Sequence, residues 1–117
     1  HYYCYILQSA DGRRSYAGST CDLGRRLRQH NGDLVGGAKC TRTGRPWCFW
    51  HVVAGFPDQR SALRFEWRLK QHRGWYRSLR GTPLERRGVL LRAAHAWARV
   101  ALPTLWLCGK DAQEELK

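Results

Sequence analysis

The chain has 117 residues, 43% of them hydrophobic and six of them tryptophan, which suffices for one folded domain but not comfortably for two. Its 21 Lys and Arg against nine Asp and Glu give a formal net charge of +12, which favours a nucleic acid as partner over a generic basic protein or a membrane-surface binder. No apolar run approaches the roughly 20 residues of a membrane-spanning helix, so we expect no membrane partner.

The first predicted element is a strand over residues 2–9, "YYCYILQS", which is rich in aromatic and β-branched residues. Alternation places Tyr3, Tyr5 and Leu7 on one face and the equally bulky Tyr2, Cys4 and Ile6 on the other. Because both faces are bulky, we expect a central strand. The Asp-Gly pair in "ADGRR" predicts a hairpin turn, and "SYAGST" returns as a second strand.

Residues 21–32, "CDLGRRLRQHNG", predict a helix. Asp22 can cap its start, Leu23 and Leu27 share a face, and Asn31-Gly32 ends it. The Gly-rich, basic residues 33–46 predict a loop, and "WCFWHVVAGF" at 47–56 predicts a strand.

A second helix is predicted over residues 58–72, capped by Asp58 and with Ala62, Leu63, Trp67 and Lys70 along one side. A third is predicted over 83–99, followed by an apolar segment at 100–108. This order indicates an α+β domain whose small, mostly antiparallel sheet is flanked by helices. We divide the single domain into a core at 1–80 and a C-terminal helical extension at 81–117.

The five cysteines are scattered without a CxxC pair, which argues against a zinc site. We expect reduced thiols in an intracellular protein, although Cys40 and Cys48 could meet across the loop.

Arg26 and His30 are four residues apart on the first predicted helix and so share a face. Such a pair could hold a phosphate, with Arg neutralising charge and His carrying a proton. A solvated helix face is an equally good interpretation on spacing alone.

Glu66 lies between Phe65 and Trp67 in a chain with few acids. A carboxylate in aromatic surroundings needs a partner, either a basic side chain or a metal ion. Mg²⁺ takes one or two carboxylates together with phosphate oxygens, so a single Glu on a basic surface suits a one-metal phosphodiesterase. A salt bridge to Arg64, Lys70 or Arg26 is the alternative.

Tyrosine could supply the general base that phosphodiester hydrolysis needs. A phenol has a pKa of about 10, and nearby positive charge would favour its phenolate. The sequence offers no Ser-His-Asp set, P-loop or Rossmann pattern as a competing site.

Two tyrosine triplets resemble the defining motif of the GIY-YIG nucleases: Tyr3-Cys4-Tyr5 stands at the first triplet and Tyr16-Ala17-Gly18 at the second. The continuation through "GSTCDLGRRLRQHNG", "TRTGRPW" and "GFPDQRSALRFEW" is similar to one branch, the catalytic subunit of the eukaryotic structure-specific endonuclease. The resemblance covers roughly residues 2–108 and does not extend to the RING-type zinc domain of that branch.

The resemblance implies a GIY-YIG fold with a three-stranded central sheet and a metal-dependent DNA endonuclease. By position, it implies Tyr5 and Tyr16 as the active-site tyrosines, Arg26 and His30 as their helix partners, and Glu66 as the ligand of Mg²⁺ or Mn²⁺. Tyr5 would activate water, with Tyr16 as its rival. Five basic residues are expected to contact the DNA backbone: Lys39, Arg42, Arg45, Arg25 and Arg28.

The implied substrates are branched double-stranded DNA, namely 5′ flaps, replication forks and Holliday junctions. The implied partner is a large scaffold subunit and the implied localisation is the nucleus. Another GIY-YIG nuclease, viral or from a mobile element, is the alternative enzyme. A catalytically idle nucleic-acid-binding module is the alternative from another class, but it would not need to keep all five site residues.

Overall fold

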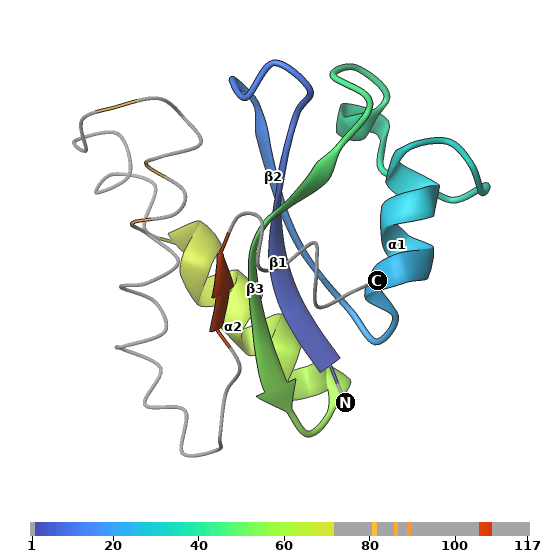
Figure 1. The fold of residues 1–117 in the computed structure, drawn as a ribbon. Coiled ribbons are helices and arrows are strands. Elements are labelled where there is room, and N and C mark those ends of the chain that lie inside the picture. The colour runs from blue at the N-terminus through green and yellow to red at the C-terminus, as the bar shows by residue number, and fades with distance from the viewer. Residues whose placement is uncertain (1, 72–80, 82–85, 87–88, 90–105, 109–117) are drawn as a thin grey trace.

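The computed structural model describes residues 2–71, 81, 86, 89 and 106–108. Its centre is a four-stranded antiparallel sheet with strand order β2-β1-β3-β4 (Figure 1). The strands are β1 (Tyr2–Gln8), β2 (Ser15–Thr20), β3 (Cys48–Phe56) and β4 (Trp106–Cys108). The predicted central position of β1 is confirmed, because β1 pairs with β2 on one side and with β3 on the other.

The fourth strand extends the three-stranded sheet that we expected. It lies within the predicted apolar segment and pairs with residues His51 to Val53 of β3. A segment of three residues is too short to show the alternation of polar and apolar residues that is typical of a strand. Its pairing with β3 identifies it as a strand.

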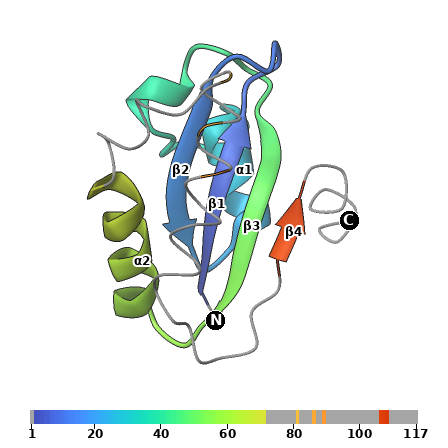
Figure 2. The same ribbon diagram turned by 90° about the vertical axis from the view of Figure 1, so that its left-hand side faces the viewer.

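Two helices cover opposite faces of the sheet (Figures 1 and 2). Helix α1 (Leu23–His30) packs over a cluster that contains Tyr5, Leu7 and Phe49, whereas α2 (Gln59–Gln71) packs over Cys4, Ile6 and Val53. This division follows the predicted alternation along β1. The predicted α+β class, with helices flanking an antiparallel sheet, is confirmed.

The predicted caps begin both helices. The Asp22 carboxylate accepts from the backbone N–H of Arg25 at 3.0 Å, and the Asp58 carboxylate accepts from that of Ser61 at 2.7 Å. Asn31 caps the C-terminus of α1. These bonds satisfy backbone groups that a helix end leaves without an intrahelical partner.

The side of α2 that was predicted to carry Ala62, Leu63, Trp67 and Lys70 does not coincide with the side that faces the core. Ala62 is buried as expected, but Leu63 and Trp67 are 46% and 62% exposed, and Phe65 takes the second core position. Residues 62 and 65 are three apart and share a face, whereas residues 63 and 67 are rotated away from it. The two exposed side chains line a surface groove together with Gln59, Arg60 and Arg64.

The loop after α1 is pinned by Asn31. The Asn31 side chain accepts from the Trp47 backbone N–H at 2.6 Å and donates to the Trp47 carbonyl at 3.0 Å. Between them lies a single turn of 3-10 helix, η1 (Lys39–Thr41). The loop between α1 and β3 is therefore held in a fixed position over the C-terminal end of α1.

The predicted helix over 83–99 and the boundary of the C-terminal extension fall mostly outside the described residues. Within the described part of the chain, Cys4, Cys21, Cys40 and Cys48 are free thiols. No helix among the described residues is long and apolar enough to cross a membrane.

Candidate active site

Tyr5 lies at the middle of β1 and faces α1. Its side chain is 1% exposed, and its hydroxyl lies 2.9 Å from Nε2 of His30. Directly opposite in the strand register is Gly18 of β2, where a Cβ would lie 2.6 Å from Tyr5 Oη. The missing side chain at position 18 therefore makes the space that the Tyr5 hydroxyl occupies.

His30 is the last residue of α1 and is fully buried. Both of its ring nitrogens are engaged: Nε2 with Tyr5 Oη and Nδ1 with Thr41 Oγ1, each at 2.9 Å. Burial lowers the pKa of His30 to about 4, and the charges of Arg26 and Arg45 act in the same direction. His30 is therefore uncharged at neutral pH, and it faces Tyr5 instead of the solvent.

Tyr16 of β2 lies beside this pair. Its ring centroid is 4.8 Å from that of His30 and 6.4 Å from that of Tyr5. Tyr16 is only half-buried, whereas Tyr5 is fully buried. Tyr16 is thus the more accessible of the two phenols.

Arg26 of α1 is half-buried and held in a fixed position. Its Nη1 donates to Gln29 Oε1 at 2.9 Å and to the Gly36 carbonyl at 2.8 Å. Gly37 lets the loop approach this closely, because a Cβ there would overlap the carbonyl oxygen of Gln29. The loop after α1 therefore orients the guanidinium as well as covering the helix end.

The pKa values of both tyrosines are raised above the ordinary phenol value. Burial is the largest cause for each, and the Arg26 guanidinium beside them lowers the pKa by less than burial raises it. The Arg26 charge therefore favours the phenolate in the expected direction, but desolvation of the two phenols outweighs it. Both phenols are protonated at neutral pH.

Glu66 comes from α2, on the opposite side of the sheet from α1, and is half-buried. Its negative charge raises the pKa of both Tyr5 and Tyr16, so the carboxylate lies within electrostatic reach of the two phenols. Helix α2 is held against β1 by Cys4, whose Sγ donates to the Ala62 carbonyl at 3.2 Å one turn before Glu66. Burial raises the pKa of the Cys4 thiol, which makes it a packing residue and not a nucleophile.

The structure thus brings four of the five predicted catalytic residues together, namely Tyr5, Tyr16, Arg26 and His30, and Glu66 lies within electrostatic reach of the two tyrosines. Their individual roles stay predictions.

Among the described residues, Glu66 is the carboxylate that this arrangement offers to a divalent metal ion. The described residues contain no cluster of three or more His, Cys, Asp or Glu that could hold a metal by themselves. Mg²⁺ commonly keeps several waters and takes one or two carboxylates plus substrate phosphate oxygens. Glu66 can supply that carboxylate.

The five basic residues predicted to contact DNA lie on two elements. Lys39 and Arg42 are exposed on and just after η1, and Arg45 follows in the same loop. Arg45 also has a structural contact, because its Nε donates to the His30 carbonyl at 2.8 Å.

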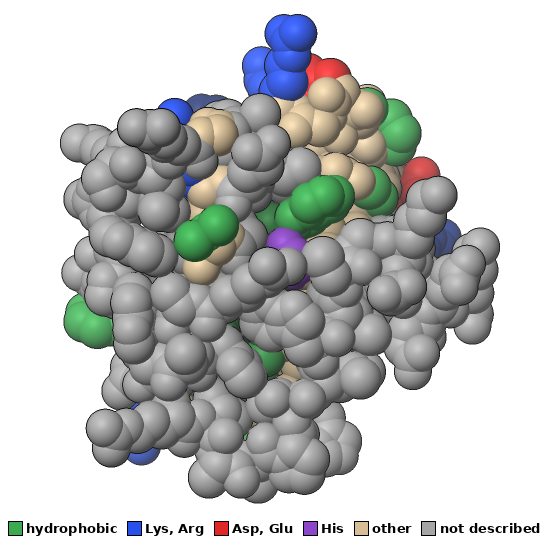
Figure 3. Space-filling view, turned by 60° about the vertical axis from the view of Figure 1, so that its left-hand side comes forward, with side chains coloured by type: hydrophobic (Ala, Val, Ile, Leu, Met, Phe, Trp, Pro, Cys, Tyr) green, Lys and Arg blue, Asp and Glu red, His purple; other side chains and the backbone are tan. Residues whose placement is uncertain are grey.

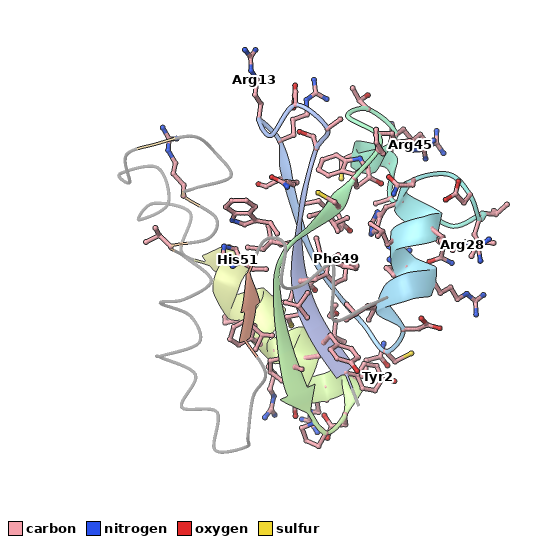
Figure 4. The ribbon with its side chains drawn as sticks, in the orientation of Figure 1. Tyr2, Arg13, Arg28, Arg45, Phe49 and His51 are labelled. Carbon is pink, nitrogen blue, oxygen red and sulfur yellow. The ribbon has the colours of Figure 1, made fainter. Side chains whose placement is uncertain are left out.

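Arg25 and Arg28 are exposed on the side of α1 that faces away from the sheet, and Figure 4 shows Arg28 projecting outward. The fold does not bring these two residues to the tyrosines. Their predicted contacts with DNA would lie outside the reacting centre.

Thr41 carries the second hydrogen bond to His30 and was not among the predicted site residues. Nothing in "AKCTRTG" distinguishes Thr41 from its neighbour Thr43. Gly18 belongs to the quoted second triplet, but its effect on Tyr5 required the strand register.

Residues 1–78 match the family described as the GIY-YIG catalytic domain. A similar protein is the structure-specific endonuclease subunit slx1 of Schizosaccharomyces pombe, 55% identical over 69 residues, which cover 56% of this chain and 26% of that protein. The SLX1 homolog of Cryptosporidium parvum is 49% identical over 67 residues, which cover 57% of this chain and 16% of that protein. The SLX1 subunit of Cryptococcus neoformans is 51% identical over 69 residues, which cover 56% of this chain and 14% of that protein.

The chain therefore spans about a quarter or less of the length of these relatives. The matched region contains the whole tyrosine, arginine, histidine and glutamate site. By its match over residues 1–78 and the geometry of that site, the chain belongs to the GIY-YIG family of nuclease domains.

Proposed function

We propose that this chain is the nuclease domain of a structure-specific DNA endonuclease, which hydrolyses phosphodiester bonds in 5′ flaps, replication forks and four-way junctions. The observation that carries the proposal is the cluster of two tyrosines, an arginine and a histidine, with a glutamate in electrostatic reach, in a domain of this family. Relatives that share about half of the aligned residues are named structure-specific endonuclease subunits.

In this proposal, the side chains divide the work of hydrolysis. Arg26, fixed by Gln29 and the Gly36 carbonyl, binds the scissile phosphate and stabilises its growing negative charge. Tyr5 accepts a proton from the attacking water, and Tyr16 is its rival for that role. Glu66 would hold Mg²⁺ or Mn²⁺, which when bound polarises the phosphoryl oxygens and neutralises the leaving oxygen.

Substrate shape would be selected by contacts between the exposed basic side chains and the DNA backbone. The matched relatives are named as subunits, so we propose that this chain acts together with a scaffold subunit. A nuclear site of action follows from this proposal.

The test is cleavage of a 5′-flap substrate against a linear duplex of the same sequence, with Mg²⁺, with Mn²⁺ and with neither. We expect faster cleavage of the flap and none without metal. Equal rates on both substrates would contradict structure selection, and no cleavage of either with both metals would contradict the nuclease assignment.

A Glu66→Gln variant tests the metal ligand separately. It should lose cleavage about 100-fold or more while its DNA affinity changes little, because only the charged ligand is removed. If DNA binding falls as much as cleavage does, Glu66 is structural. Arg64→Gln, a charge removal two residues earlier on the exposed side of α2, is the matched control.

A further inference from the structure

Thr41 connects the candidate site to the loop that covers α1. Its side chain is fully buried, and its Oγ1 makes two contacts: one with Nδ1 of His30 and one with the Ala38 carbonyl, each at 2.9 Å. The Thr41 carbonyl in turn accepts from Nε1 of Trp47 at 2.8 Å. Thr41 therefore has a fixed place between the loop and the histidine.

These contacts decide where the protons of the hydrogen-bonded chain lie. A carbonyl oxygen only accepts, so the single hydroxyl proton of Thr41 is donated to Ala38. Thr41 Oγ1 is then left as an acceptor toward His30, and Nδ1 must carry the imidazole proton. In a neutral imidazole the other nitrogen has no proton, so Nε2 accepts and the Tyr5 hydroxyl donates.

We infer that Thr41 is a positioning residue, which holds His30 in the Nδ1–H tautomer and thereby directs the Tyr5 hydroxyl proton onto Nε2. For catalysis the inference rests on the proposed nuclease function. The tautomer itself can be measured without any cleavage.

The direction of the Tyr5 proton matters for the reaction. With its proton pointing at His30, the Tyr5 oxygen presents its lone pairs to the side where Arg26 lies. When water attacks phosphorus, one water O–H bond breaks and its proton bonds to Tyr5 Oη. The original Tyr5 O–H bond breaks at the same time and its proton bonds to Nε2, so the products are a phenol and an imidazolium.

This relay lets Tyr5 accept a proton without first standing as a buried phenolate. Burial opposes that phenolate, because it raises the pKa of Tyr5. The imidazolium that the relay forms is also opposed by burial, which lowers the pKa of His30 to about 4, so His30 holds the proton only transiently and returns it to Tyr5 after the attack. In the opposite tautomer, Nε2 would carry a proton and could not accept one. Thr41 would then control whether Tyr5 works as a base at all.

The first experiment is ¹⁵N NMR of the histidine rings of the whole chain at pH 7, with the His30 signals assigned by their loss in a His30→Gln variant. Couplings between the ring nitrogens and the carbon-bound ring protons distinguish the two tautomers. We expect His30 as the Nδ1–H tautomer in the wild-type protein. The Nε2–H tautomer would overturn the inference, whatever the protein cleaves.

The second experiment compares Thr41→Val, which keeps the shape and removes the hydroxyl, with Thr41→Ser, which keeps the hydroxyl. In Thr41→Val the proton should move to Nε2, and kcat on the 5′ flap should fall about 10- to 100-fold, as for other residues that orient a reacting group. Thr41→Ser should restore both the tautomer and the rate. DNA affinity should stay within about twofold throughout, since Thr41 is buried.

Thr43→Val is the matched control, because Thr43 is exposed two residues away in the same loop. A Thr41→Val enzyme that cleaves as fast as this control would overturn the positioning role. If the tautomer shifts as expected but the wild-type protein cleaves no DNA, the proposed nuclease function fails and the tautomer assignment stands.

Discussion

The hydroxyl of Tyr5 lies in a space that Gly18 leaves open across the strand pair. Any side chain at position 18 would displace the phenol from its present position, since a Cβ would meet Tyr5 Oη at 2.6 Å. We therefore expect Gly18→Ala to lower flap cleavage about 100-fold, the cost of displacing a reacting group by about 1 Å. Cleavage kinetics check this.

Gly24→Ala is the control for that substitution. A Cβ on Gly24 would lie 3.8 Å from its nearest neighbour, an oxygen of Asp22, so the helix can accept it. We expect unchanged cleavage and a gain in stability of about 0.5–1 kcal/mol, because alanine loses less backbone entropy than glycine on folding. Equal cleavage by Gly18→Ala and Gly24→Ala would contradict the close approach.

His30 makes the stability of the fold depend on pH. Its pKa is about 4 in the folded protein against about 6.5 in an unfolded chain, so between these values the unfolded state binds more protons. Neutral His30 therefore makes its full contribution to the free energy of unfolding above pH 6.5. That contribution is lost as the pH falls toward 4. The loss should reach about 3 kcal/mol.

Urea unfolding of wild type and His30→Gln at pH 7 and pH 4.5 measures this contribution. The free energy of unfolding should fall more steeply in the wild type. Asp11 and Asp58, whose pKa values are lowered by hydrogen bonds, add a loss at lower pH that both proteins share. Identical pH dependence in the two proteins would show that His30 does not titrate as the structure indicates.

At the scale of elements, Asn31 joins the end of α1 to the start of β3. Asn31→Ala would remove both hydrogen bonds to the Trp47 backbone and leave the N–H of that buried residue without its partner. We expect a loss of about 1–3 kcal/mol in unfolding free energy. Cleavage should also fall, because Trp47 holds Thr41 and Thr41 contacts His30.

Asp22→Ala at the other end of the same helix is the comparison. Loss of the N-cap should cost about 1 kcal/mol but leave the loop over His30 in place. Thermal unfolding and flap cleavage measured on both variants separate the two effects. If Asp22→Ala reduces cleavage as much as Asn31→Ala does, the loop has no special part in ordering the site.

Over the whole molecule, positive charge is spread across the hairpin turn, α1 and the loop after it. Arg13, labelled at the tip of the turn in Figure 4, and Arg28 on α1 both point to solvent, and Figure 3 shows Lys and Arg side chains projecting at the upper end of the molecule. With a net charge of +12, the protein should bind DNA through phosphate contacts that release counterions.

We expect the logarithm of the DNA-binding constant to fall steeply and linearly with the logarithm of salt concentration. Arg42→Gln should reduce that slope by about one, the effect of one lost phosphate contact. Arg13→Gln should leave the slope unchanged if DNA follows the predicted loop. Equal slopes for both variants would indicate a diffuse charge effect, and a slope near zero in the wild type would contradict the electrostatic argument altogether.

The strands of the core, the two helices with their Asp caps, and the family could all be predicted from the sequence. These features depend on local pattern: alternation along β1, carboxylates before each helix, and the fixed spacing of the tyrosine triplets. The sequence also named Tyr5, Tyr16, Arg26 and His30, which the structure brings together, whereas on α2 it picked out Ala62 correctly but Leu63 and Trp67 in place of Phe65.

The contacts of each of those residues could be read only from the folded protein. Residues 5, 18, 30 and 41 are far apart along the chain, and their meeting depends on strand register and on the path of one loop. The pKa of Tyr5 shows the same dependence on the fold. The charge of Arg26 lowers this pKa, but desolvation of the buried phenol raises it by more. Sequence spacing carries neither the desolvation of a side chain nor the direction of a hydrogen bond, because both arise from neighbours that folding brings in from elsewhere.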